Sequence, residues 1–201
     1  MSRLAIFVDG GYLDALAEDE FSIRVDLGKL GNEIRQIVDA QTADSVDLLR
    51  TFYYHCLPYQ SNPPTQEEAI RFGNMRKFFY ALSRLPRFFV REGRLAFRGM
   101  NADGKPIFQQ KRVDLLLGLD FALLSGKRQI THAAVISGDS DLIPAFRVAK
   151  EEGILVWLFH GPRTSNIDGS STFADELWQE ADERYEIDLA FMQRIELPQN
   201  R

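Results

Sequence analysis

The sequence predicts an α/β fold in which helices cover both faces of a mostly parallel sheet. Short apolar runs alternate along the chain with segments whose apolar residues recur at helical spacing. Such runs are typical of strands buried on both faces, and strands that alternate with helices build parallel sheets. With 201 residues and 45% hydrophobic content, the chain is long enough for a sizeable core. We therefore expect residues 1–201 to form a single domain.

The first part of the chain predicts two strands and two helices. Residues 4–8 form a continuous apolar run and predict a strand, and a short helix is expected over residues 12–17. Asp26 is placed to cap a second helix, whose apolar positions recur along residues 27–38. Residues 46–56 are rich in β-branched and aromatic side chains, which predicts the second strand.

The middle of the chain is punctuated by proline and glycine. A loop over residues 57–64 contains three prolines and ends at Thr65-Gln66-Glu67-Glu68, the pattern of a capping box that opens a helix. Residues 87–91 predict a third strand. Residues 95–98 are expected to pair with it as a hairpin before a turn at residues 101–104.

The remaining segments continue the alternation of strands and helices. They are a helix over residues 111–124, a strand over 133–136, a helix over 142–150, a strand over 154–159 and a polar loop over 160–172. Apolar side chains then alternate at Tyr185, Ile187, Leu189 and Phe191, which predicts a final edge strand.

Charge is distributed unevenly along the chain. The net charge of −5 argues against a simple basic nucleic-acid-binding module. Residues 84–112, however, carry eight Lys and Arg against Glu92 and Asp103, a net +6, so the rest of the chain carries −11. This asymmetry suits an acidic centre beside a basic approach surface for nucleic acid. A basic face that is merely solvated is the alternative.

The single Cys56 excludes an intrachain disulfide and favours a reducing compartment. The N-terminal apolar run is too short for a signal peptide, and no stretch approaches the ~20 apolar residues of a membrane span. We expect a cytoplasmic protein without a membrane partner.

Aspartates follow two of the predicted strands and begin one predicted helix. Asp139 and Asp141 lie in Ser137-Gly138-Asp139-Ser140-Asp141-Leu142, directly after the strand at 133–136. Helix capping explains one of these two carboxylates well and the second poorly. Two neighbouring carboxylates repel each other unless a cation or a proton lies between them. Asp9 follows the first strand and is expected at the same sheet edge, although Asp-Gly is also a common turn pair.

Asp114 is expected in the first turn of its helix, where the helix dipole alone favours a carboxylate. Asp120 falls off the same face and is expected to be a structural partner or exposed to solvent. Four carboxylates from three segments require cations, and oxygen ligands favour Mg²⁺ or Mn²⁺. The three histidines are expected to be packing or surface residues, and Ser137 and Ser140 either hold the turn or contact a phosphate.

Three motifs carry a resemblance to a known family. Phe7-Val8-Asp9-Gly10-Gly11, Lys111-Arg112-Val113-Asp114 and Ser137-Gly138-Asp139-Ser140-Asp141 resemble the acidic motifs of the NYN family, which includes LabA-like proteins and belongs to the PIN-like nuclease group. The resemblance covers residues 3–160, and residues 173–201 form an extension beyond the motifs. It implies a three-layer α/β/α PIN-like domain with a metal site at Asp9, Asp114, Asp139 and Asp141 that acts on RNA. Tyr12 departs from the family, many of whose members have Asn shortly after the first Asp-Gly.

These observations lead to two expectations about function. The first is a ribonuclease dependent on Mg²⁺ or Mn²⁺, with the four aspartates as catalytic metal ligands. Its RNA-contacting residues would be Ser137, Ser140, Arg94, Arg98, Lys111, Arg112 and Arg163. The alternative, favoured by Tyr12, is a non-catalytic regulator that binds RNA or protein. Homo-oligomerisation is compatible with either.

Overall fold

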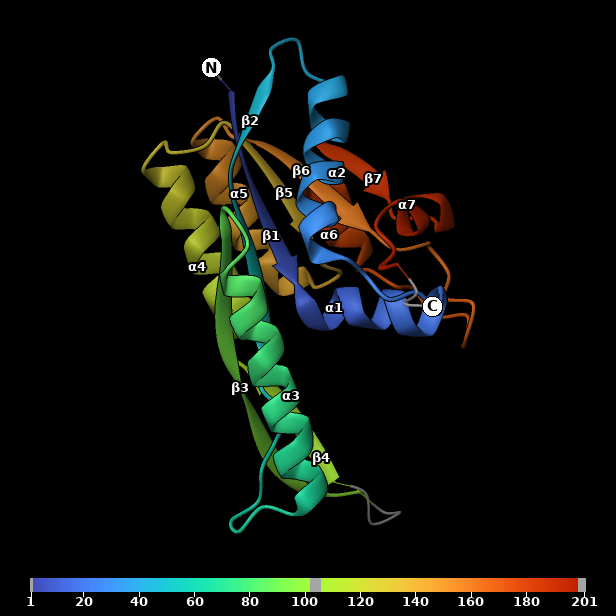
Figure 1. Cartoon of the computed structure of the whole chain (residues 1–201). Coiled ribbons are helices and arrows are strands. Elements are labelled where there is room, and N and C mark those ends of the chain that lie inside the picture. The colour runs from blue at the N-terminus through green and yellow to red at the C-terminus, as the bar shows by residue number, and fades with distance from the viewer. Residues whose placement is uncertain (1, 102–105, 199–201) are drawn as a thin grey trace.

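The computed structural model describes residues 2–101 and 106–198. Over these residues, seven strands form one sheet in the order β4-β3-β2-β1-β5-β6-β7 (Figure 1). The strands are β1 (Ser2–Asp9), β2 (Val46–Cys56), β3 (Phe88–Met100), β4 (Pro106–Lys111), β5 (His132–Ile136), β6 (Leu155–His160) and β7 (Glu183–Glu186). All neighbouring pairs are parallel except β3 and β4. The predicted α/β class is confirmed.

Helices cover both faces of the sheet and give three layers. One face carries α1 (Gly10–Ala15), the π-helix η1 (Leu16–Glu20), α2 (Leu27–Ala40), α3 (Gln66–Ser83) and α7 (Leu189–Arg194). The other face carries α4 (Val113–Gly126), the 3₁₀ helix η2 (Ser140–Leu142), α5 (Ile143–Glu151) and α6 (Asp175–Glu180). Both predicted helix caps are present. Asp26 accepts hydrogen bonds from the Gly28 and Lys29 amides, and Thr65 and Glu68 form a capping box.

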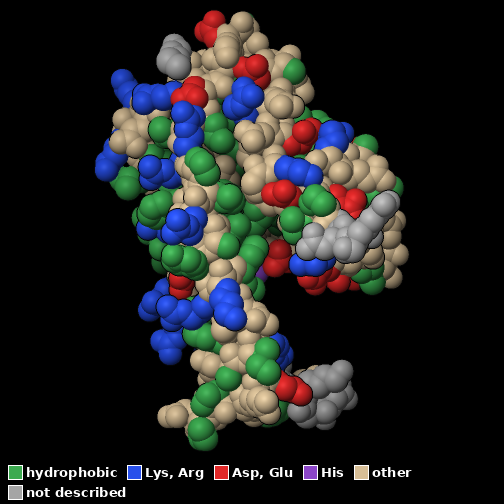
Figure 2. Space-filling view, in the orientation of Figure 1, with side chains coloured by type: hydrophobic (Ala, Val, Ile, Leu, Met, Phe, Trp, Pro, Cys, Tyr) green, Lys and Arg blue, Asp and Glu red, His purple; other side chains and the backbone are tan. Residues whose placement is uncertain are grey.

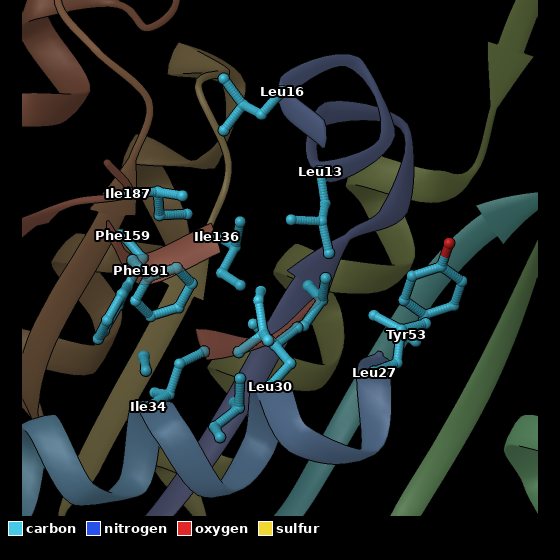
Figure 3. Packing of buried hydrophobic residues seen from close by; sticks show 14 of the residues in the cluster. Leu13, Leu16, Leu27, Leu30, Ile34, Tyr53, Ile136, Phe159, Ile187 and Phe191 are labelled. Atoms are coloured by element: carbon cyan, nitrogen blue, oxygen red, sulfur yellow. The ribbon is translucent and has the colours of Figure 1, made fainter. Parts of the chain in front are cut away.

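Two hydrophobic cores lie between these layers, one on each face of the sheet. Figure 3 shows the first, in which leucine and isoleucine side chains of α2 meet Ile136, Phe159 and Phe191. In the second, Phe7 packs between Phe52 and Phe121 at ring distances of 5.4 and 5.0 Å. Because strands such as β1 are buried on both faces, their sequences read as continuous apolar runs.

The chain reverses its direction across the sheet between β1 and β5. From β1 it moves outward through β2 and β3, and after β4 it crosses on α4 to β5 on the other side of β1. In open α/β sheets, such a switch point leaves a crevice outside the carboxyl ends of the strands. The residues that follow β1 and β5 therefore lie at the rim of this crevice.

The molecule has a projecting arm, defined here as α3, the part of β3 from Arg94 to Met100, and β4 (Figures 1 and 2). β3 pairs with β2 as far as Gly93 opposite Cys56, and then continues beyond the carboxyl edge of the sheet. The expected hairpin between residues 87–91 and 95–98 is wrong, because both segments belong to this one strand. The partner of its outer part is β4, and most of the expected turn at 101–104 lies outside the described residues.

The expected final strand is correct only at its beginning. Tyr185 lies in β7, but Leu189 and Phe191 belong to α7, whose N-cap Asp188 accepts a hydrogen bond from the Phe191 amide at 2.7 Å. Ile187, Phe191 and Ile195 recur every four residues and are all buried, so the helical spacing prevails over the alternation. Among the described residues, no helix is both long and apolar enough to span a bilayer.

Candidate active site

Asp9 is the last residue of β1 and the N-cap of α1, and its Oδ1 accepts a hydrogen bond from the Tyr12 amide at 3.2 Å. The next residue must be glycine, because a Cβ on Gly10 would lie 2.6 Å from His55 Cδ2 and 2.7 Å from the Tyr53 ring. This close passage of the chain over β2 holds Asp9 at the rim of the crevice.

Asp114 reaches the same edge by a different route. β4 runs antiparallel to β3, from the end of the arm back to Lys111 opposite Arg94, next to the end of β2. Arg112 then adopts a left-handed conformation (φ 74°), and α4 starts at Val113. The return of β4 therefore places the first turn of α4, with the half-buried Asp114, at the carboxyl edge of the sheet.

Asp139 and Asp141 lie in the turn between β5 and α5. Asp139 caps η2: its Oδ1 accepts from the Asp141 amide at 2.9 Å, and its own amide donates to Ser137 Oγ at 3.2 Å. The capping interpretation therefore holds for Asp139. It does not account for Asp141, whose exposed carboxylate has no hydrogen bond within the described residues.

The charges of these carboxylates act on one another. Burial, together with the charge of Asp114, raises the pKa of Asp9 to about 6. Burial also raises the pKa of Asp114, and the charges of Asp139 and Asp141 raise it further. Asp114 and Asp141 line the same groove between α4 and α5. The charges of the four aspartates, which come from three segments of the chain, are therefore linked through Asp114.

Over the described residues, none of the four aspartates forms an ion pair, and the one cationic group that acts on them is His55, whose charge lowers the pKa of Asp9 and so offsets part of the effect of burial. Nor, in the same residues, are three His, Cys, Asp or Glu side chains close enough to hold an ion by themselves. Mg²⁺ commonly retains several waters and binds through one or two carboxylates and substrate phosphates. An open, oxygen-only donor set fits Mg²⁺ or Mn²⁺ better than a closed site of the zinc type.

Tyr12 lies beneath the turn that carries Asp139 and Asp141. Its hydroxyl accepts a hydrogen bond from the Gly161 amide at 2.8 Å, and its ring is so near Gly138 that a Cβ there would lie 2.8 Å from it. Burial raises the pKa of the Tyr12 phenol. Tyr12 thus ties the Asp139 turn to the loop after β6, and its oxygen is bonded to that loop.

A second polar pair at this edge was not anticipated from the sequence. His55, at the end of β2, places its Nε2 3.0 Å from Asp14 Oδ2 on α1. Burial alone would lower the pKa of His55, but the hydrogen bond and charge of Asp14 outweigh it and raise the pKa. Asp9 adds to this effect. The available signal was position, because His55 is the next-to-last residue of the strand beside β1 and Asp9 is the last residue of β1.

The remaining candidates differ in their surroundings. Ser137 is fully buried and its hydroxyl serves the turn, whereas Ser140 is half-buried at the start of η2. Arg163 pairs with Asp175 at 2.6 Å and lies over the rings of Phe173 and Trp178. Asp120 is a structural partner, since it binds the Arg91 guanidinium through both oxygens and also the Tyr54 hydroxyl.

Only the later part of the basic segment lies at the acidic edge, since Arg87 pairs with Asp47 at the opposite edge of the sheet and Arg91 pairs with Asp120. Arg94 and Arg98 are exposed on the part of β3 that continues beyond this edge, and Lys111 and Arg112 directly precede the helix of Asp114. In Figure 2, Lys and Arg side chains follow the α3 side of the molecule, and Asp and Glu side chains gather around the hollow between the arm and the α1 side.

The fold and this edge define the class of protein: a PIN-like α/β/α domain with acidic side chains at its switch point. The chain matches the NYN domain family over residues 3–188, and it belongs to that family. The match extends past residue 160, where the resemblance was expected to end, and includes the arm and β7. The family is nuclease-like and of the ribonuclease type. A search of curated proteins found no match to the chain.

Proposed function

We propose that this protein is a metal-dependent ribonuclease that hydrolyses RNA phosphodiester bonds. What supports the proposal is that Asp9, Asp114, Asp139 and Asp141 come to one edge of the sheet, where the charge of Asp114 acts on Asp9 and the charges of Asp139 and Asp141 act on Asp114. Like charges held together in a partly buried place cost stability, and a bound cation would offset that cost.

The residues of the chain have distinct tasks in this proposal. Asp9 and Asp114, whose pKa values burial raises, would hold the cation against the sheet, while Asp139 is half-buried in its turn and Asp141 is exposed to solvent. Bound Mg²⁺ or Mn²⁺ would activate a water and stabilise the leaving oxygen. Because the pKa of Asp9 is about 6, protons compete with the cation, and metal affinity should fall below this pH.

RNA would reach the acidic edge along the arm. Arg94, Arg98, Lys111 and Arg112 supply backbone-binding charge, and Phe97 and Tyr59 form an aromatic pair at 5.8 Å beside them. Phe97 is exposed and Tyr59 is half-buried. Accessible rings beside cations are typical of surfaces that bind single strands by stacking and phosphate contacts. Ser140 and Arg163 are secondary candidates for phosphate contact, and Ser137 supports the turn. We further propose one LabA-like domain over residues 1–201, acting in a reducing cytoplasm.

The test is cleavage of an end-labelled single-stranded RNA with Mn²⁺ or with a chelator. We expect the wild type to cleave with metal only and Asp114→Asn to be inactive. Asp44→Asn, at an exposed position before β2, is the matched control and should retain activity. Cleavage by Asp114→Asn at the wild-type rate would refute the assignment.

The second candidate is a regulator that binds RNA or protein without cutting. Tyr12 favours it, because the family's more frequent Asn is replaced by a ring whose hydroxyl is bonded to Gly161. RNA binding without metal-dependent cleavage, in a folded wild type, would support this candidate.

A further inference from the structure

Helix α4 is apolar on the side that faces away from the sheet as well as on its buried side. Val113, Leu117 and Phe121 are buried against the sheet. On the outer side, Leu115, Leu119 and Leu123 are 64%, 57% and 53% exposed. These three leucines are spaced by four residues and form a ridge along the helix. A helix that is apolar all round is normally covered on every side, so this ridge calls for a partner.

A groove runs beside this leucine ridge, between α4 and α5. Its volume is about 520 Å³, and small residues form its floor: Gly118, Ala122 and Ala145. Even a Cβ on Gly118 would lie 3.8 Å from the Ala145 Cβ, so there is room above it. The exposed Val148 lines the wall on α5. Leu115 and Leu119 of the ridge form one wall of this groove. A ridge beside a groove on one face is an arrangement that can pack against a copy of itself.

The lining of the groove indicates what kind of molecule it accommodates. It contains no Lys or Arg, and its polar members are Asp114 and Asp141. A phosphate backbone, which requires cations, is therefore disfavoured there. The other end of α4 is followed by the exposed Lys127 and Arg128, of which Arg128 lies 3.6 Å from Glu152. A two-fold axis near Leu119 would place the acidic end of one copy towards the basic end of the other.

We propose that the α4–α5 face is a homodimer interface in which the leucine ridge of one copy lies in the groove of the other. Stable interfaces of this kind bury about 800 Å² on each partner around an apolar centre. Four exposed apolar side chains on α4 and α5 supply that centre, and the charged ends supply the rim. The proposal does not depend on nuclease activity. Because Asp114 and Asp141 line the same groove, a second copy and RNA at the acidic edge would compete for it.

The test is the mass of the full chain in solution, measured by sedimentation over a concentration series. We expect a dimer for the wild type. Leu119→Glu places a charge in the centre of the interface and should raise the dimer dissociation constant at least ~100-fold. Gly118→Leu fills the groove and should have the same effect. The control is Tyr80→Glu on α3, since Tyr80 is 64% exposed, close to the 57% of Leu119, but lies on the other face of the sheet.

Circular dichroism melting checks that each variant is folded, which is expected because Leu119 and Gly118 face open space. A monomeric wild type at every concentration would overturn the proposal. So would a dimer that persists in both α4 variants, or one that dissociates equally with Tyr80→Glu. If Leu119→Glu instead weakens RNA binding without changing the mass, the groove is a nucleic-acid surface and the dimer assignment is wrong.

Discussion

The charged carboxylate of Asp9 lowers the free energy of unfolding of the metal-free protein. Its pKa of about 6 lies above the ordinary value of 3.8, because burial and Asp114 disfavour the charged form. A group whose pKa is raised on folding contributes stability that is fully present below its pKa in the unfolded chain. For Asp9 this contribution is lost as the pH rises from about 4 to 6. The pKa of His55 is raised as well, so the stability that its protonated form contributes is lost at higher pH. Both groups therefore make the metal-free protein less stable as the pH rises.

Asp9→Asn should make the metal-free protein more stable at pH 8, by on the order of 1–3 kcal/mol, and should change little below pH 4. Asn is as good an N-cap as Asp, so the bond from the Tyr12 amide is kept. Urea unfolding at the two pH values in chelator measures the difference, with Asp44→Asn as the control. A destabilised Asp9→Asn at pH 8 would show that its carboxylate is favourable in the folded state.

Tyr12→Phe separates the structural task of this residue from any role in chemistry. The change leaves the Gly161 amide without its partner and should cost about 1–2 kcal/mol, with faster hydrogen exchange at Gly161. Because the hydroxyl is bonded to the loop after β6, RNA cleavage should be unaffected. A selective loss of cleavage in a stable Tyr12→Phe protein would instead give the hydroxyl a role at the site.

At the scale of the elements, local signals predicted most of the fold. β2 was predicted at residues 46–56 and spans those residues, and the caps at Asp26 and Thr65 are both formed. Two predicted elements were wrong. One depended on a partner strand later in the chain, and in the other the same residues fit both strand spacing and helix spacing. β3 continues past Gly93 because β4 pairs with its outer part, and residues 185–191 satisfy strand and helix spacing at once. The π-helix η1 gave no signal that sequence reasoning could use.

The arm leads to a prediction about RNA binding. Arg94→Glu and Arg98→Glu, each made alone, should weaken binding and reduce the slope of log affinity against log salt by about one or two. Arg3→Glu, at the opposite edge of the sheet, is the matched control and should leave both quantities unchanged. Fluorescence anisotropy over a salt series gives the slopes. Equal slopes in all four proteins would mean that the arm is a solvated basic face.

At the scale of the whole molecule, topology assembles the site. Strand ends at the switch point were enough to predict the positions of Asp9, Asp139 and Asp141, because each follows a run of apolar residues. Asp114 was placed by motif, and its position depends on the return of β4, which local patterns do not show. The His55–Asp14 pair joins β2 to α1 and could not be derived from either segment alone. Contacts between side chains of different elements could not be predicted from the sequence.

The most direct test of the acidic site is Mn²⁺ binding, measured by calorimetry and by the melting temperature with and without the ion. We expect Mn²⁺ to bind and to stabilise the wild type. Asp139→Asn and Asp141→Asn should bind Mn²⁺ more weakly than the wild type. Without metal, both variants should melt at the wild-type temperature or slightly above it, with a free energy of unfolding higher by at most on the order of 1 kcal/mol. A wild type that neither binds Mn²⁺ nor gains stability from it, or variants that bind it as the wild type does, would contradict a cation site at these four aspartates.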